Sequence, residues 1–384
     1  KKQFLGDGAN FEASTCYHRL SAEIVTFGTA LVLGLPASRK NSLKKIDPQK
    51  WRFIPEIQTR FLRSIGSQKF IGQPHFDLIA RMALFTIHIT KPNRQILQIG
   101  DNDSGRIIKI FPTYENDLDH SHLIASINGI FDEKELKKFL GEKGYFETSL
   151  IQSLAHNQVA KSTWFTKKLK QTIPKKSHLN ITKLIETNIF FSDPEITQNL
   201  KIIKFPYFGL YIWYSERFFL SVRCGPIGQN GRGGHAHNDQ LSIGLQIDGI
   251  DWIMDPGSFI YTPDPKVRNL YRSFFAHACP RIEKDEPSRL SYGMFQLENN
   301  TNARCVQFGK KRFLGTYSGK KNIIYRQIEI HRGAIQLIDG IVGHHHKQAI
   351  FEVKNAYSPN DLTEIFDLKC PVSKHYGVCD QTTR

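Results

Sequence analysis

Hydrophobic residues recur at helical spacing, three or four positions apart, through residues 1–155. Glycine and aspartate cluster between the periodic stretches, and Pro92 follows one of them, as expected where helices end. Several amphipathic helices in series, without strand-like stretches, predict a helical bundle, solenoid or toroid. The helices are predicted at residues 11–35, 53–65, 76–90, 120–131 and 133–140.

The hydrophobic pattern changes after a stretch at residues 156–200 that is rich in Lys, Thr, Ser and Asn, which we interpret as a linker. Beyond about residue 201, short apolar runs alternate with turn residues, and Asp248-Gly249 is typical of a tight hairpin. Many short strands at regular spacing predict an antiparallel β-sandwich at 201–384, so the fold class is α+β and multidomain. Strands are predicted at 207–214, 218–222, 241–247, 251–254, around 295–296, and at 303–308, 322–330 and 333–338.

The composition is typical of a globular protein, with 40% of the residues hydrophobic and 23% charged. A chain of 384 residues is long enough to form two hydrophobic cores. No run of about 18 apolar residues predicts a membrane span. The first residues are not a signal peptide, because no apolar stretch follows the basic start, and we expect the chain to begin inside a longer protein.

The net charge of +16 favours an anionic partner, either nucleic acid or an acidic polysaccharide. The lysine pairs are scattered along the chain, which is typical of solvated surfaces, and no basic helix or aromatic RNA-binding motif accompanies them. We therefore expect no nucleic-acid partner, and the overall sign of the charge suits an anionic glycan such as an acidic polysaccharide. Six cysteines occur without C-x-x-C spacing, which disfavours a zinc–thiolate site. For Cys370 and Cys379, a disulfide and free thiols both stay open.

A dense set of imidazole and carboxylate groups lies between Gly231 and His277. His235 and His237 are two residues apart, so on a strand both would point to one face. One imidazole could then bind a metal while the other transfers protons. With Asp255 and His277 downstream, the set offers the N and O ligands that zinc takes.

The string G-G-H-A-H-N-D-x-L-S at 233–242 is followed by D-P-G-S-x-x-Y at 255–261 and R-S-x-x-A-H at 272–277. These pieces resemble the C-terminal domain of the heparinase II/III-like polysaccharide lyases, and related alginate lyases look similar. Residues 7–18 resemble the segment of the same family's helical domain that carries a catalytic tyrosine. The resemblance implies that residues 1–155 are part of an (α/α) toroid whose N-terminal portion lies outside this chain.

The resemblance also implies roles for individual residues. Tyr17 and His235 match the catalytic pair, facing each other between the two domains, and Tyr261 corresponds to a second tyrosine used by some members. His237, Asp255 and His277 match the ligands of a structural zinc ion. Arginine pairs bidentately with carboxylates, so arginines near the motifs are candidates for substrate binding. The candidate substrate-binding residues are Arg106, Arg232, Arg268 and Arg272.

The implied reaction is β-elimination of a uronate-containing polysaccharide, in which a base removes the C5 proton and an acid protonates the departing O4. The family is bacterial, and the resemblance implies a periplasmic or secreted protein.

This sequence departs from the family pattern in two places. The Asn or His that neutralises the substrate carboxylate in these lyases would precede Lys1, and Ala278-Cys279 replaces a common Asn-Thr pair.

Two other functions stay open. His235-x-His237-x-Asp239 matches the start of the H-x-H-x-D-H set of zinc hydrolases, although Gln240 stands where that set needs His. A non-catalytic glycan-binding protein is the third hypothesis.

The loop at 101–105 looks like part of a calcium loop, D-x-D-x-G, but lacks the terminal glutamate, so we predict a turn with Arg106 at its end. His344-His345-His346 is predicted to be a solvated turn.

Overall fold

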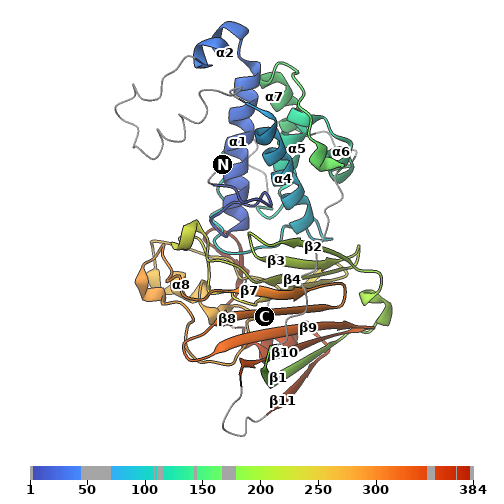
Figure 1. The fold of residues 1–384 in the computed structure, drawn as a ribbon, viewed down its shortest axis with the longest axis vertical. Coiled ribbons are helices and arrows are strands. Elements are labelled where there is room, and N and C mark those ends of the chain that lie inside the picture. Colours follow the sequence, from blue (N-terminus) through green and yellow to red (C-terminus); the bar gives the residue numbers. More distant parts are fainter. Residues whose placement is uncertain are drawn as a thin grey trace. The chain divides into compact units, whose positions relative to one another are not determined.

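The computed structural model describes residues 3–44, 71–107, 109, 116–141, 145–166, 179–343, 351–368 and 370–380. Helices come first and mainly antiparallel sheets follow, which confirms the predicted α+β class (Figure 1). The chain forms two compact units: one contains residues 1–20, 88–120 and 169–384, and the other contains 21–87 and 121–168.

The smaller unit is helical. Its central helix α5 is mainly apolar, and all of its residues are buried; α6 and α7 pack against it. The predicted helices at 11–35, 76–90, 120–131 and 133–140 are confirmed, whereas 53–65 lies outside the described residues. Helices α2 and α7 were not predicted. The helices are α1 (Thr15–Gly34), α2 (Ala37–Lys44), α4 (Gln73–Ile89), α5 (Ser121–Phe131), α6 (Lys134–Leu140) and α7 (Phe146–Leu154), and α1 and α4 each continue into the larger unit.

The larger unit contains two main sheets. A five-stranded sheet has the order β2-β3-β4-β5-β6, and a six-stranded sheet has the order β11-β1-β10-β9-β8-β7. Neighbouring strands are antiparallel, except that β1 and β11 are parallel. The strands of the first sheet are β2 (Lys201–Phe205), β3 (Leu210–Tyr214), β4 (Phe218–Arg223), β5 (Ile243–Ile247) and β6 (Ile250–Ile253). Those of the second are β1 (Ile181–Phe190), β7 (Arg304–Phe308), β8 (Arg312–Ser318), β9 (Ile323–His331), β10 (Ala334–Val342) and β11 (Glu352–Ala356).

The shorter elements lie between and after these strands. They are the hairpin strands β12 (Val372–His375) and β13 (Val378–Asp380), the helices α8 (Pro265–Tyr271) and α9 (Pro359–Ile365), and the 3-10 turns η2 (Thr163–Phe165), η3 (Pro194–Thr197), η4 (Gln229–Gly231), η5 (Phe274–Ala276) and η6 (Leu290–Tyr292).

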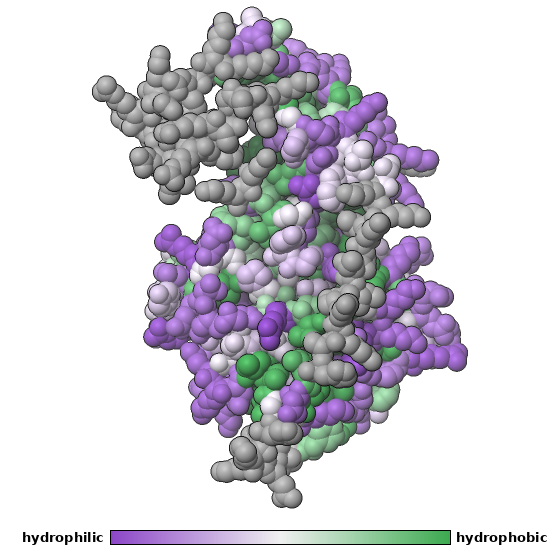
Figure 2. Space-filling view, in the orientation of Figure 1, coloured by the Kyte–Doolittle hydropathy of each residue, from purple (hydrophilic) through white to green (hydrophobic). Residues whose placement is uncertain are grey.

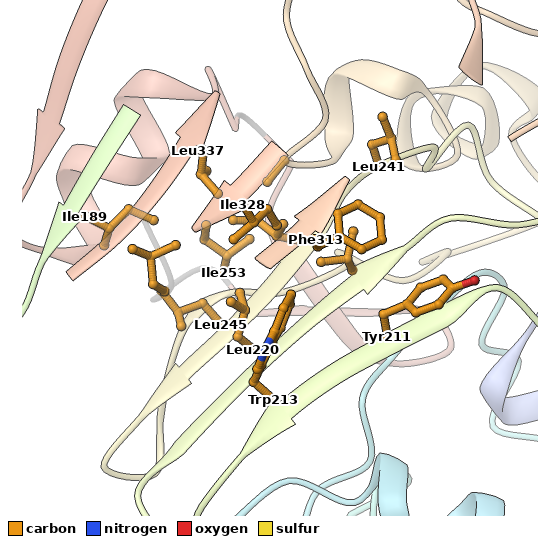
Figure 3. Close-up of a cluster of buried hydrophobic side chains, with 14 of the residues drawn as sticks. Ile189, Tyr211, Trp213, Leu220, Leu241, Leu245, Ile253, Phe313, Ile328 and Leu337 are labelled. Carbon is orange, nitrogen blue, oxygen red and sulfur yellow. The ribbon is translucent and has the colours of Figure 1, made fainter. Parts of the chain in front are cut away.

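One hydrophobic core joins the two sheets, which confirms the predicted sandwich. Trp213 and Leu220 of the five-stranded sheet meet Ile328 and Leu337 of the six-stranded sheet in this core (Figure 3). Each large apolar side chain buried in this way contributes roughly 1.5–3 kcal/mol. The sheets therefore form a rigid base for the loops that leave their ends.

Some elements differ from the prediction. β1 lies inside the range predicted as linker. At every second position of this strand, Ile181, Ile185 and Ile189 alternate with Lys183 and Thr187. β8 was not predicted, and residues 295–296 contribute only an isolated bridge between Gly293 and Gln296. The Asp248-Gly249 hairpin is confirmed, with positive φ at both residues.

The compact units also do not coincide with the predicted ranges, because residues 1–20 and 88–120 cluster with the sheets.

All six cysteines are free thiols, Cys370 and Cys379 included. Within the described residues, every helix is too short or too polar to cross a membrane.

Candidate functional site

Three buried side chains of the larger unit converge at one point. His237 Nδ1 lies 3.1 Å from His277 Nε2. The Asp255 carboxylate lies 3.2 Å from His277 Nε2 and 3.5 Å from His237 Nδ1. Bonds of about 2.0–2.1 Å to a tetrahedral zinc ion would place ligand atoms about 3.3 Å apart. The three residues predicted from sequence as metal ligands therefore come together with spacings that fit such an ion.

The outer nitrogens of both histidines are engaged, which determines where their lone pairs point. His277 Nδ1 donates to the Ser273 carbonyl at 2.7 Å, and His237 Nε2 donates to Asp101 Oδ1 at 3.0 Å. With these N–H groups directed outward, His237 Nδ1 and His277 Nε2 face each other as two lone pairs. Two lone pairs at 3.1 Å need a proton or a metal ion between them.

The local charge also favours a cation. Burial disfavours the charged form of His237, yet the Asp255 and Asp101 carboxylates raise its pKa to about 9. Burial disfavours the ionised form of Asp255 too, but the two neighbouring histidines lower its pKa. The same negative potential that holds a proton here would hold a metal ion.

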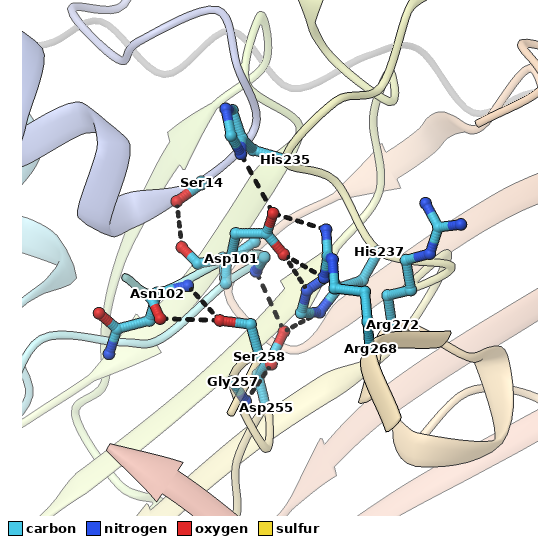
Figure 4. Close-up of polar contacts among 12 residues, drawn as sticks. Ser14, Asp101, Asn102, His235, His237, Asp255, Gly257, Ser258, Arg268 and Arg272 are labelled. Atoms are coloured by element: carbon cyan, nitrogen blue, oxygen red, sulfur yellow. Dashed lines mark hydrogen bonds and ion pairs between the residues drawn. The ribbon is translucent and has the colours of Figure 1, made fainter. Parts of the chain in front are cut away.

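Asp101 links this cluster to His235 (Figure 4). Its carboxylate is completely buried, accepts from His235 Nδ1 at 3.1 Å, and forms a bidentate ion pair with Arg268 at 2.5 and 2.6 Å. Burial opposes ionisation, but Arg268 and the two histidines hold the pKa of Asp101 at about 2. Because His235 donates its Nδ1 proton to Asp101, its Nε2 is the nitrogen left to accept, and the Glu12 carboxylate lies 4.0 Å from it.

Tyr17 lies directly against His235. The two rings are stacked with centroids 3.6 Å apart and an interplanar angle of 19°. The Tyr17 hydroxyl donates to Asp103 Oδ2 at 2.8 Å. Burial and the negative charge of Asp103 raise the pKa of Tyr17, so its phenol stays protonated in this arrangement. Both residues belong to the larger unit, so the predicted pair meets inside one unit and not between two domains.

The position of Tyr17 is set by the start of α1. Ser14 Oγ accepts the Tyr17 amide and donates to the Asp101 carbonyl, and Thr15 exchanges two hydrogen bonds with Ile99. Gly100 makes this close approach feasible: it has a φ of +67°, and a Cβ there would lie 2.6 Å from the His235 carbonyl oxygen. Three distant parts of the chain therefore meet with no space for a methyl group.

An open pocket of about 420 Å³ lies over the stacked pair. Its lining residues are Tyr17, Asp103, His235, Tyr261, Phe295 and Tyr376. The Tyr261 amide donates to the Tyr376 hydroxyl at 3.1 Å, and the buried Tyr261 hydroxyl interacts with the Tyr17 hydroxyl. Tyr261 therefore lines the same pocket as Tyr17 and His235.

The four candidate arginines differ in exposure. Arg268 is fully buried and paired with Asp101, and Arg272 is fully buried and donates to the carbonyls of three residues, Leu290, Gly293 and Gln296. Neither guanidinium is free to reach the pocket, so we do not assign these two to substrate binding. Arg232 is exposed and Arg106 half-buried, and their substrate contacts stay predictions.

Sequence reasoning did not identify Asp101, Asp103 or Tyr376 as site residues. The two aspartates belong to the D-x-D-x-G string, which resembled part of a calcium loop; instead their carboxylates face His235 and Tyr17. Asp239 does not join the metal cluster, and its carboxylate lies 3.4 Å from Arg223. The H-x-H-x-D set of zinc hydrolases is therefore not assembled among the described residues.

Comparisons with known proteins agree with the sequence motifs. Residues 197–332 match the family model described as Heparinase II/III-like, C-terminal, which confirms the predicted family resemblance for this segment. No curated protein matches the chain.

Solved structures similar to the chain include the heparan sulfate lyase HepC from Pedobacter heparinus, at 16% identity and a TM-score of 0.49 over 90% of this chain. A heparinase III structure is similar at 12% identity and a TM-score of 0.46 over 89% of this chain. The chain spans only 40% and 41% of the lengths of these two proteins.

Proposed function

We propose that this chain is the catalytic portion of a polysaccharide lyase that cleaves a uronate-containing polysaccharide by β-elimination. The observation that carries the proposal is the stacking of Tyr17 on His235 beneath an open pocket, with each side chain held by its own carboxylate. The match of residues 197–332 to the heparinase II/III-like family model supports the choice of reaction.

In the proposed reaction His235 is the base. Asp101 accepts its Nδ1 proton, so Nε2 is available to remove the C5 proton of the uronate. The buried carboxylate would also stabilise the imidazolium that forms, in the way that a buried aspartate supports a catalytic histidine elsewhere.

Tyr17 is the acid in this scheme. Its phenol is kept protonated by burial and by Asp103, so it can donate a proton to the departing O4. The C5–H bond breaks, the C4–C5 double bond forms, and the C4–O4 bond breaks as O4 takes the phenol proton. Tyr261 lines the same pocket, and we propose that it assists as a second hydroxyl.

We propose that His237, Asp255 and His277 hold a structural zinc ion. Zinc bound there would join the segment after His235 to two later loops and so keep the catalytic imidazole in place. Arg232 and Arg106 are the arginines that we propose for the substrate carboxylates, since bidentate pairing would offset the charge that develops on the uronate. A uronate polymer as substrate also fits a periplasmic or secreted location.

The test is to incubate the full-length protein with a panel of uronate polymers and to follow the ultraviolet absorbance of new carbon–carbon double bonds. Product with an unsaturated uronate at its end is expected from at least one polymer. Cleavage without double bonds would favour the zinc hydrolase, and tight binding without cleavage would favour a glycan-binding protein.

A further inference from the structure

A second groove lies in the larger unit, at one edge of the sandwich. It has a volume of about 920 Å³ and is formed where β2 begins, where β7 turns into β8, and where β9 turns into β10. None of its lining residues lines the pocket over Tyr17 and His235. They are Thr197, Gln198, Asn199, Leu200, Lys201, Ile202, Tyr214, Lys310, Lys311, Ile330, His331 and Arg332.

The groove is strongly basic. Lys201, Lys310, Lys311 and Arg332 all line it and are exposed, and no carboxylate is among its lining residues. Arg332 pairs with Glu195, whereas none of the three lysines forms an ion pair with another described residue. Figure 2 shows hydrophilic residues gathered along the edge of the sheets where β9 turns into β10.

Buried side chains hold the cationic turns in place. The Trp213 indole N–H donates to the Gly309 and Lys310 carbonyls, each at 3.0 Å, and the indole itself is fully buried. Thr197 Oγ1 donates to the His331 carbonyl at 2.7 Å and accepts the Gly333 amide at 2.9 Å. The lysines therefore project from backbone that is already ordered, which lowers the entropy lost when a ligand binds.

We propose that this groove is a second, non-catalytic binding site for an anionic polysaccharide. Its volume is within the range of ligand sites, and its cations suit carboxylate and sulfate groups. The exposed Gln198 and Asn199 amides, which line the same groove, suit sugar hydroxyls.

A single-stranded nucleic acid is the less suitable polyanion. Such ligands are held by stacking bases on aromatic side chains, and the rings in the lining are the half-exposed Tyr214 and the smaller imidazole of the exposed His331. The choice of a uronate glycan rests on the proposed function, but the site itself does not depend on elimination.

The experiment measures binding of a defined heparan sulfate oligosaccharide in 150 mM NaCl, about physiological ionic strength. All proteins are full-length and carry Tyr17→Phe, so that cleavage does not consume the probe. The test variant is Lys310→Glu/Lys311→Glu. The matched control is Lys320→Glu/Lys321→Glu, an exposed lysine pair between β8 and β9 that makes the same change in net charge outside the groove.

We expect the test variant to bind at least about tenfold more weakly and the control to change by less than about twofold, because the charge reversal acts mainly at short range in salt. Equal weakening in both variants, or no binding by the parent, would overturn the proposal. An oligo-dT of equal charge that binds the groove as tightly would overturn the assignment to a glycan. If only the proposed elimination activity is wrong, the protein that retains Tyr17 forms no unsaturated product, but the binding result still holds.

Discussion

Replacing Asp101 by asparagine tests the central arrangement of the site. The side chain keeps its size but loses its charge and one acceptor oxygen. The carboxylate now accepts from both His235 and His237, one on each oxygen. An amide offers one oxygen and one NH₂ group, so one of the two imidazoles must change tautomer or lose its partner.

The stability cost follows from the buried ion pair. Asp101→Asn leaves the fully buried Arg268 without its counter-charge, and breaking such a pair costs about 3–5 kcal/mol. The lowered pKa of Asp101 also means that its ionised form stabilises the folded state. A fall from 3.8 to about 2 corresponds to roughly 2 kcal/mol, fully present above pH 4 and lost as the pH falls towards 2. The substitution costs more because it also leaves Arg268 unpaired.

Urea unfolding at pH 7, zinc titration and the elimination assay give the readouts. Asp339→Asn is the matched control, because Asp339 forms a similar bidentate pair with the buried Arg326 at 2.7 and 2.6 Å in the sandwich. We expect both variants to lose similar stability. Only Asp101→Asn should also lower zinc affinity, by about 10–100-fold, and reduce kcat. If its zinc affinity and kcat match those of the control, Asp101 does not set the histidine tautomers.

Further predictions concern the pocket, the metal cluster and acid stability. Tyr17→Phe and His235→Ala should abolish double-bond formation by the full-length protein while circular dichroism stays unchanged; normal turnover in either variant would contradict the assigned pair. His237→Ala should lower zinc content and the Tm together, whereas the exposed His331→Ala should change neither, and equal zinc in both would refute the metal site. Burial lowers the pKa of His88 to about 4, so the folded state favours its neutral form. Stability from this residue is complete above about pH 6.5 and falls by up to about 3 kcal/mol as the pH drops to 4. His88→Phe should flatten this part of the pH–stability curve, and an unchanged curve would contradict the burial argument.

The sequence predicted the parts of the fold that depend on local patterns. Short apolar runs between turn residues marked most strands, and positive φ at Asp248 and Gly249 agrees with the predicted hairpin. β8 was missed because Gly315 interrupts its apolar run, although the strand is buried. β1 was missed because its lysine and threonines resemble a linker until its pairing with β10 is known.

The candidate site was likewise predicted only where a local sequence motif marks it. His237, Asp255 and His277 were predicted as a ligand set from the motifs that resemble the heparinase II/III-like lyases, and the three side chains lie together in the structure. Asp101 and Asp103 are more than 130 residues from His235, so no local spacing relates them to it. The folded chain is needed to show that this loop belongs to the site: Asp101 contacts His235, Asp103 contacts Tyr17, and Gly100 packs against the His235 backbone.

The discontinuous larger unit has a practical consequence for dissecting the protein. A fragment that begins at β1 would contain both sheets but would lack Tyr17, Asp101 and Asp103, because these come from residues 1–20 and 88–120. Such a fragment would expose the buried faces of His237 and Arg268 to water. Recombining halves of related proteins would therefore succeed only if the early segments and the sheets were taken from the same parent.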